Sequence, residues 1–192
     1  QDELPQSAGG RTITTTEPKF IPQEAVELKL AGEVTIRVRL VDCVGFMVEG
    51  AAGHLENGAE RLVKTPWYDH EIPFTQAAEL GTRKVITDHS TIGVVVTTDG
   101  SFSDLPQETY LDAENQAISE LKKLHKPFLV LVNSSHPSSR TAREAAERIE
   151  KQHSVAAMPV NCAQLSEEDI RQIMEQILYE FPVSRVEFYM PK

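Results

Sequence analysis

The stretch VTIRVRLVDCVG, residues 34–45, decides how this chain folds. It alternates between apolar and more polar positions, the apolar set being Val34, Ile36, Val38 and Leu40. Alternation of period two with β-branched residues predicts a strand. Asp42 ends that strand, and Gly45 follows in a D-x-x-G pattern. Ligands of open α/β sheets gather at the carboxyl ends of strands, so Asp42 is a candidate Mg²⁺ ligand and the Gly45 N–H a candidate phosphate donor. D-x-x-G is also common by chance, and a plain strand-to-turn is the alternative.

The flanking segments predict an α/β fold with a mostly parallel sheet. Residues 25–30 predict a strand that pairs through the Ala31-Gly32 turn with the strand ending at Asp42, giving one antiparallel hairpin at a sheet edge. The apolar runs TIGVVVT (91–97) and FLVLVN (128–133), with residues 155–160, predict strands of a parallel sheet, the first of them buried on both faces. Helices are predicted over residues 75–89, 107–125, 139–153 and 166–179, the last with a capping box that starts at Ser166. Strand–helix alternation of this kind predicts helices on both faces of the sheet.

Composition and charge exclude several classes of function. The net charge of −10 argues against a general nucleic-acid or membrane-surface binder, because those partners need a basic face. No run approaches the roughly 20 apolar residues of a membrane span. Cys43 and Cys162 follow apolar strands and lack ligand spacing, so free thiols in a reducing cytosol are expected. The chain starts at Gln1, and we expect it to be a piece of a longer protein.

Four polar signals follow one another in a recognisable order. They are the loop threonines Thr15 and Thr16, the D-x-x-G at Asp42, the threonines Thr97 and Thr98 after a buried strand, and Asn133 after the next strand. This order resembles the translation-factor branch of the P-loop nucleoside triphosphatases, with residues 42–45 as the Walker B segment.

A closer resemblance is to the ATPase domain of the stage IV sporulation protein A family. It is carried by TTEPKFIP (15–22), VRLVDCVG (38–45), TPWY (65–68), GTRKVI (81–86), HSTIGVVVTTDG (89–100) and YEFPV (179–183). The set is far more specific than D-x-x-G alone.

The resemblance implies roles for individual residues. Asp42 would serve Mg²⁺, Thr15 or Thr16 would be the switch-I metal ligand, and Thr97 or Thr98 would sense the γ-phosphate of ATP. Gly45 and Asn133 would contact the nucleotide. A threonine hydroxyl can ligate Mg²⁺ or donate to a phosphate oxygen, so the chemistry agrees with these roles.

The resemblance also implies a biological setting. It implies ATP hydrolysis that drives self-assembly into a homopolymer, the basement layer of the spore coat. It places that polymer in the cytoplasm of the mother cell, at the outer surface of the forespore. Small membrane-anchoring proteins and coat proteins would be its partners, and no nucleic acid or transmembrane segment is expected.

Two side-chain departures from related enzymes are informative. Enzymes that select guanine have an aspartate three residues after an asparagine. In this chain that asparagine is Asn133, and the position of the aspartate holds His136. A site without that hydrogen-bond acceptor does not select guanine, so ATP is favoured. Ras-type enzymes place a water-orienting glutamine directly after D-x-x-G, and this chain has Phe46. Hydrolysis is therefore expected to be slow or to use a residue elsewhere.

The phosphate-binding loop itself is missing from these residues. No G-x-x-x-x-G-K-[ST] occurs in the 192 residues, and in the family that loop and its strand precede the position of Gln1. We therefore expect a P-loop NTPase-like three-layer sandwich without its first strand, over residues 1–182, with 183–192 beginning a linker or another domain. The fragment is expected to bind and hydrolyse ATP poorly. A non-catalytic assembly module and a GTPase of the ribosome-factor type are the alternatives.

Overall fold

A computed structural model describes residues 19–30, 34–51 and 53–182. The strands are β1 (Lys19–Lys29), β2 (Thr35–Asp42), β3 (Leu55–Glu56), β4 (Ala59–Glu60), β5 (Leu62–Val63), β6 (Ile72–Pro73), β7 (Gly93–Thr98), β8 (Phe128–Asn133) and β9 (Ala157–Val160). The helices are α1 (Phe74–Lys84), α2 (Leu111–Lys123), α3 (Arg140–His153) and α4 (Glu167–Tyr179). A π-helical turn, Val85–His89, continues α1, and a 3₁₀ turn, Gln107–Tyr110, leads into α2.

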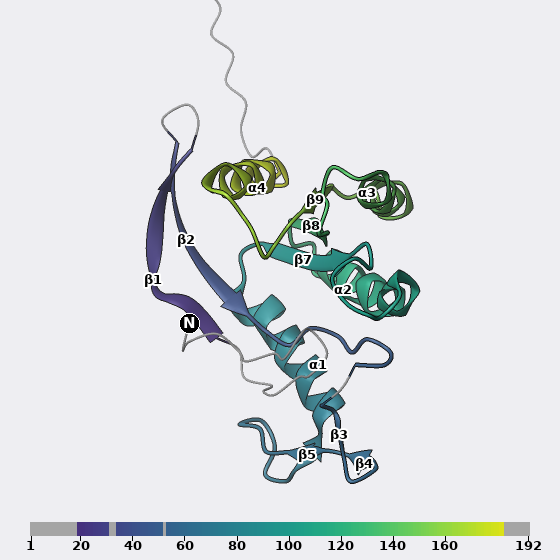
Figure 1. The fold of residues 1–192 in the computed structure, drawn as a ribbon. Helices are drawn as coiled ribbons and strands as arrows, with labels where there is room; N and C mark the ends of the chain where they lie inside the picture. The colour runs from purple at the N-terminus through teal and green to yellow at the C-terminus, as the bar shows by residue number, and fades with distance from the viewer. Residues whose placement is uncertain (1–18, 31–33, 52, 183–192) are drawn as a thin grey trace, which may run out of the picture.

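The parallel sheet β7-β8-β9 lies between two helical layers (Figure 1). One core packs the sheet against α2 and α3 through Val130, Ile118 and Ile149, all fully buried. A second core packs the opposite face against α4 through Leu129, Leu131 and Ile173. The uninterrupted apolar run of β8 follows from this arrangement, since both of its faces are covered. The predicted three-layer α/β sandwich is confirmed.

The predicted antiparallel hairpin forms, but its first strand begins at Lys19 rather than Ala25, and in the described residues it does not join the edge of the parallel sheet. β1 and β2 pair antiparallel from Lys29–Thr35 to Lys19–Asp42, with a register shift between Ile21 and Val26. The shift spans Pro22, which has no N–H to donate to a ladder. The predicted turn at Ala31-Gly32 lies outside the described residues.

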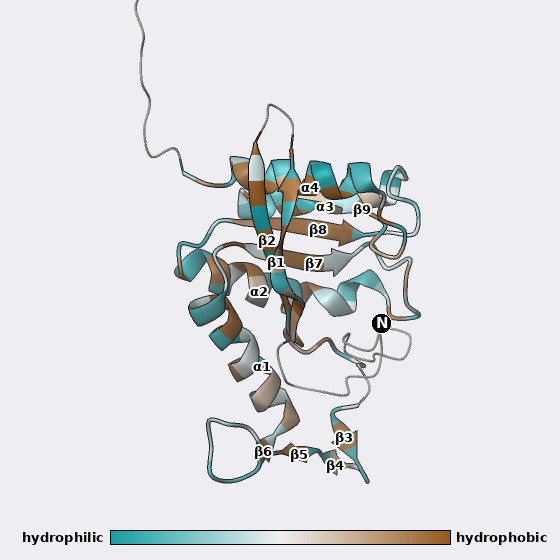
Figure 2. Ribbon diagram, turned by 90° about the vertical axis from the view of Figure 1, so that its left-hand side faces the viewer, coloured by the Kyte–Doolittle hydropathy of each residue, from teal (hydrophilic) through white to brown (hydrophobic). Residues whose placement is uncertain are grey.

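The hairpin stands apart from the parallel sheet. In the described part of the chain, β2 pairs with β1 alone and β7 with β8 alone. Figure 1 shows the hairpin on the side of the sheet that carries α4, and Figure 2 shows it passing across the direction of β7 and β8. One edge each of β2 and β7 therefore remains without a strand partner in the described structure.

The prediction that the first strand of the parallel sheet is buried on both faces is wrong for β7. Val95 is buried against α2, but Val94 and Val96 are 40% and 58% exposed. The second core is built from β8, β9 and α4, and β7 supplies none of its buried residues. One face of β7 is thus apolar and open.

The long segment between β2 and α1 contains short structure that its sequence does not predict. β3 pairs with β4, and β5 pairs with β6, each through two residue pairs. The Phe74 N–H donates to the Arg61 carbonyl, and Phe74 itself is fully buried under the Arg61 guanidinium. These contacts fix the start of α1, and Thr82 near its other end contacts Gly45.

Candidate functional site

Asp42 and Gly45 lie together where β2 ends. Asp42 is the last residue of the strand and is exposed. The surrounding protein still removes part of its hydration, which raises the pKa of the carboxyl, while a backbone hydrogen bond at Cys43 opposes that shift. Gly45 has φ +84°, and a Cβ there would meet nothing within 4 Å, so the backbone conformation is what requires glycine.

Thr82 of α1 holds Gly45 through both of its backbone groups. The Gly45 N–H donates to Thr82 Oγ1 at 3.0 Å, and the Thr82 hydroxyl lies 3.1 Å from the Gly45 carbonyl oxygen, to which it donates. Cys43 is half-buried beside them, and burial raises the pKa of its thiol. Thr82 was missed in the sequence, although Ala78, Thr82 and Val85 follow helical spacing and are all buried.

A cavity of about 420 Å³ opens at the unpaired edges of β2 and β7. Asp42 and Gly45 line it from one side and Thr97 from the other, so the structure brings three predicted site residues together. Its remaining wall is mostly apolar and includes Val94 and Val96 from one face of β7 and Val95 from the other. Side chains from both faces of an edge strand line the cavity, so it lies at the edge of the sheet rather than on a face.

The two threonines that end β7 have different partners. The Thr97 hydroxyl donates to Glu114 Oε2 of α2 at 2.8 Å in a buried contact. Thr98 accepts a 3.0 Å hydrogen bond from the Gly100 N–H and is 7% exposed. Thr98 pairs in register with Asn133, so these two predicted residues lie side by side at the carboxyl edge of the sheet.

The partner of Thr97 is a buried charge pair that the sequence did not suggest. Arg148 of α3 donates to both oxygens of Glu114, at 2.8 and 3.1 Å. The Glu114 side chain is 1% exposed and that of Arg148 is 32% exposed. Glu114 shares a helical stripe with Ile118 and Leu121, which was the available signal that it faces the core. The pair joins α2, α3 and β7.

The Asn133 side chain binds the backbone that follows β9. Its side-chain Oδ1 accepts from the Cys162 N–H at 3.0 Å, which ties the ends of β8 and β9 together. His136 lies three residues on, with its Nδ1 2.9 Å from Ser135 Oγ. His136 thus occupies the position where guanine readers place an acid, and its ring is engaged within its own loop.

A hydrogen-bonded loop cluster lies beside Asn133, at the ends of β7 and β8. Burial raises the pKa of Asp99, but hydrogen bonds from Ser101 and Ser134 outweigh it, so the carboxyl lies below its usual pKa. A shallow cavity of about 350 Å³ borders this cluster and the start of α3. Ser139 caps that helix by accepting from the Ala142 N–H. Both acceptor oxygens of Asp99 are already engaged by serines, so the cluster orders the loops.

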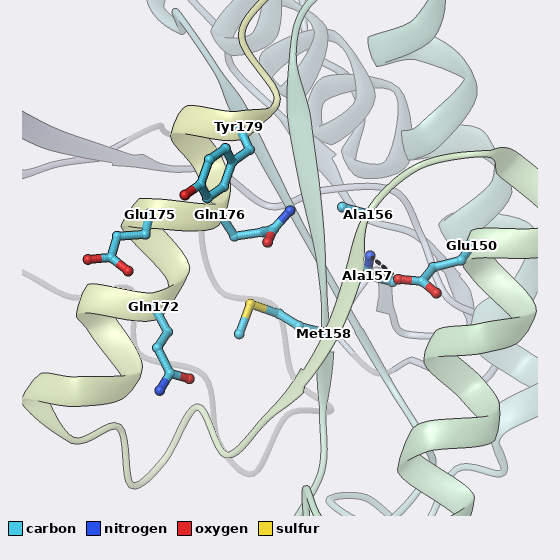
Figure 3. Close-up of a pocket in the computed structure, with 8 residues that line it drawn as sticks. All are labelled: Glu150, Ala156, Ala157, Met158, Gln172, Glu175, Gln176 and Tyr179. Atoms are coloured by element: carbon cyan, nitrogen blue, oxygen red, sulfur yellow. Dashed lines mark hydrogen bonds between the residues drawn. The ribbon is translucent and has the colours of Figure 1, made fainter. Parts of the chain in front are cut away.

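A third cavity of about 340 Å³ lies at the amino end of β9, between α3 and α4 (Figure 3). Figure 3 shows Glu150, Gln172, Gln176 and Tyr179 around it, and Glu150 accepts from the Ala157 N–H at 3.4 Å. No predicted site residue lines it.

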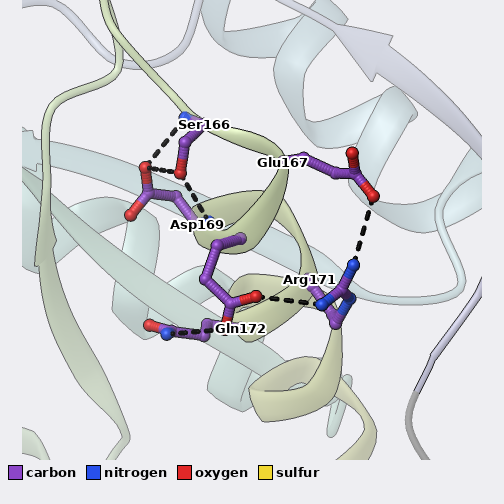
Figure 4. Close-up of polar contacts among 6 residues, drawn as sticks. Ser166, Glu167, Asp169, Arg171 and Gln172 are labelled. Carbon is purple, nitrogen blue, oxygen red and sulfur yellow. Dashed lines mark hydrogen bonds and ion pairs between the residues drawn. The ribbon is translucent and has the colours of Figure 1, made fainter.

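The helix that borders this third cavity starts at the predicted capping box (Figure 4). Ser166 accepts from the Asp169 N–H at 3.1 Å, and Asp169 accepts from the Ser166 N–H at 2.8 Å. Arg171 then binds Glu167 and Glu168 along the exposed side of the helix. The box is confirmed, and its chemistry accounts for where α4 begins.

The remaining predicted ligands, Thr15 and Thr16, lie outside the described residues. Among the residues that are described, no group of three or more His, Cys, Asp or Glu side chains is arranged to hold a metal. Mg²⁺ is commonly held by one or two carboxylates together with phosphate oxygens, so a lone Asp42 is compatible with that ion. No helix in the described ranges is long and apolar enough to cross a membrane.

Comparisons with known proteins point to one family. Residues 1–182 match the family described as stage IV sporulation protein A, ATPase domain. The chain is 47% identical to stage IV sporulation protein A of Clostridioides difficile (strain 630) over 192 residues. It is 43% identical to the proteins of that name from Bacillus anthracis and Bacillus subtilis (strain 168), over 191 residues in each case. The alignments with these three relatives cover all of the chain, but the chain spans only 39% of the length of each relative.

Proposed function

Because this chain belongs to the ATPase-domain family of stage IV sporulation protein A, we propose that it forms the Walker B half of a Mg²⁺-ATP hydrolysing site. The observation that carries the proposal is that Asp42 and Gly45 lie together where β2 ends and face, across one cavity, the strand β7 whose last residue is Thr98. Asp42 stands at the carboxyl end of a strand, where α/β sheets bind ligands.

Each residue has a role that its chemistry fits. Bound Mg²⁺ neutralises charge on the phosphates during phosphoryl transfer. Asp42 supplies a carboxylate oxygen to the ion, directly or through water, and Thr15 or Thr16 supplies a hydroxyl. Gly45 presents its N–H to a phosphate oxygen. Thr98 is the better of the paired threonines for sensing the γ-phosphate, because the Thr97 hydroxyl already donates to Glu114.

The cavity also lies where a further strand could pair with β2 or β7. The open edges of β2 and β7 border an apolar space of about 420 Å³. We infer that a strand from a longer form of the protein fills this space and carries a phosphate-binding loop to Asp42. The 192-residue chain alone should then bind Mg²⁺-ATP more weakly than micromolar by isothermal titration calorimetry. Micromolar binding by this chain would contradict the inferred strand insertion.

The nucleotide is proposed to be ATP. His136 presents no pair of acceptors to guanine, and the Asn133 amide oxygen is already bonded to the Cys162 N–H. In the longer protein, GTP should compete with ATP poorly. Effective competition by equimolar GTP would favour the ribosome-factor type of GTPase instead.

Hydrolysis is proposed to drive assembly of a homopolymer at the forespore surface, on the mother-cell side, with membrane-anchoring and coat proteins as partners. A non-catalytic assembly module is the second candidate, and a specific observation favours it. Phe46 takes the place of a water-orienting glutamine and is 8% exposed, so it cannot position a water.

Substituting Asp42 in the full-length protein separates the two candidates. Asp42→Ala should lower ATP hydrolysis by roughly 100-fold and abolish ATP-dependent polymer sedimentation, since a single electrostatic stabiliser is worth that much. Asp112→Ala, on the exposed side of α2, is the matched control and should change neither. Polymer formation that survives the loss of hydrolysis would favour the assembly module.

A further inference from the structure

Thr82 and Gly45 form a reciprocal hydrogen-bonded contact between α1 and the loop after β2. One hydroxyl accepts from the Gly45 N–H at 3.0 Å and approaches the Gly45 carbonyl at 3.1 Å. The two residues lie 37 positions apart, so the contact joins separate elements of the fold. It engages the same N–H that the proposed function assigns to a phosphate.

Gly45 is held by hydrogen bonds to Thr82 and has open space beside its Cα. A Cβ built at Gly45 would meet no atom within 4 Å, and the residue lines the cavity beside Asp42. Thr82 itself is 4% exposed and sits between the buried residues Ala78 and Val85 of the same helical stripe. Thr82 is thus fixed by the packing of its helix, whereas Gly45 itself has space beside it.

We propose that Thr82 is a positioning residue that holds the Gly45 amide in the nucleotide-free state and releases it when a γ-phosphate takes its place. This inference rests on the proposed function. One N–H cannot make two full hydrogen bonds at once, so the phosphate and the Thr82 hydroxyl compete for it. Release of Gly45 uncouples the loop after β2 from α1, which gives triphosphate binding a mechanical consequence.

The competition predicts a difference between nucleotides. A diphosphate lacks the group that displaces Thr82, so it leaves the contact intact. A ligand shifts a conformational equilibrium only through its differential affinity for the two states, and here that difference lies in the γ-phosphate. Thr82 therefore lowers affinity for the triphosphate and leaves affinity for the diphosphate unchanged.

Amide hydrogen exchange on the full-length wild-type protein tests the release directly. Residues 78–84 of α1 should exchange faster with a β,γ-imido analogue of ATP than with ADP, because only the analogue breaks the Gly45 contact. Equal or slower exchange with the analogue would overturn the proposal. This arm requires no variant and so does not depend on a substituted protein folding.

Binding measurements on variants test the competition. Thr82→Val keeps the shape of the side chain but removes the hydroxyl, and it should raise the ratio of analogue affinity to ADP affinity about two- to tenfold, the equilibrium factor of one net hydrogen bond. Thr82→Ser keeps the hydroxyl and should restore the wild-type ratio. Thr87→Val, which removes a hydroxyl that donates to the Arg83 carbonyl, is the matched control.

The outcomes separate this inference from the proposed function. An unchanged or lowered ratio in Thr82→Val, with normal nucleotide binding by the wild-type protein, would overturn the role of Thr82 and leave the proposed function standing. Failure of the wild-type protein to bind either nucleotide would instead overturn the proposed function, and the role of Thr82 with it.

Discussion

The Thr97 hydroxyl donates a 2.8 Å hydrogen bond to the buried carboxylate of Glu114. Thr97 therefore supports the fold, while the Thr98 hydroxyl lies at the end of the strand, beside Asn133. The two residues are adjacent in sequence and identical in chemistry. Their opposite directions along a strand give them separate roles.

Valine substitutions at the two positions should have different effects. Thr97→Val should lower the free energy of unfolding by about 1.5–3 kcal/mol, the value of a hydrogen bond to a charged group, and leave ATP hydrolysis by the full-length protein nearly unchanged. Thr98→Val should lower hydrolysis with a smaller loss of stability. Denaturant unfolding and steady-state hydrolysis measure these effects, and the reverse pattern would assign the sensor to Thr97.

Removal of one partner of the Glu114–Arg148 pair should be strongly destabilising. Glu114→Ala leaves Arg148 without its buried partner and should cost about 3–5 kcal/mol in the free energy of unfolding. Arg140→Ala, which breaks the exposed pair with Glu144, is the control and should cost less than about 1 kcal/mol. Equal costs measured by urea unfolding would show that burial of the Glu114 pair has no special effect.

Gly93 and Gly45 should respond differently to the same substitutions. A Cβ at Gly93 would lie 2.7 and 2.9 Å from the Leu121 methyl carbons and 3.2 Å from Phe128 Cβ, so Gly93→Ala should cost about 1–3 kcal/mol and Gly93→Asn more. At Gly45 there is space but φ is +84°, so Asn should be better tolerated than Ala. Thermal unfolding of the four variants ranks their stabilities. A Gly45→Asn protein that is less stable than Gly45→Ala would contradict the prediction.

The stability difference between the wild-type chain and Asp42→Asn should depend on pH. The folded protein raises the pKa of Asp42 above its ordinary value of 3.8, so the folded state binds a proton more tightly than the unfolded state. Stability from this residue is therefore present below pH 3.8 and is lost as pH rises through the folded pKa. Asp42→Asn should therefore have the same free energy of unfolding as the wild-type chain below pH 3.8 and a higher one above the folded pKa. Chemical unfolding at a pH below and a pH above this range measures the difference. An Asp42→Asn protein that is less stable than the wild type at pH 7 would contradict the prediction.

The hairpin and the helix starts could be predicted because their signals are local. Alternation before Asp42 and the Ser166–Asp169 box each act within one element, and both formed as predicted. Exposure of Val94 and Val96 depends on which strands α4 covers, and no pattern within β7 carries that information.

The contacts around the site could be predicted only in part. Thr82 and Gly45 lie 37 positions apart in the sequence. The groups of Gly45 that bind Thr82 are backbone atoms, which every residue carries, so no sequence pattern marks this contact. The helical spacing of Glu114 with Ile118 and Leu121 indicated a buried position, whereas the charge of its side chain favoured an exposed one. The choice between Thr97 and Thr98 depended on where α2 places Glu114.

The central claim, that Asp42 brings Mg²⁺ to a bound ATP, is tested most directly by the Mg²⁺ dependence of ATP affinity in the full-length protein. The wild-type protein should bind ATP more tightly as Mg²⁺ is raised, and Asp42→Asn should lose most of that dependence while it still binds ATP weakly without the ion. An Asp42→Asn protein whose ATP affinity rises with Mg²⁺ as steeply as the wild type would show that this carboxylate does not serve the metal.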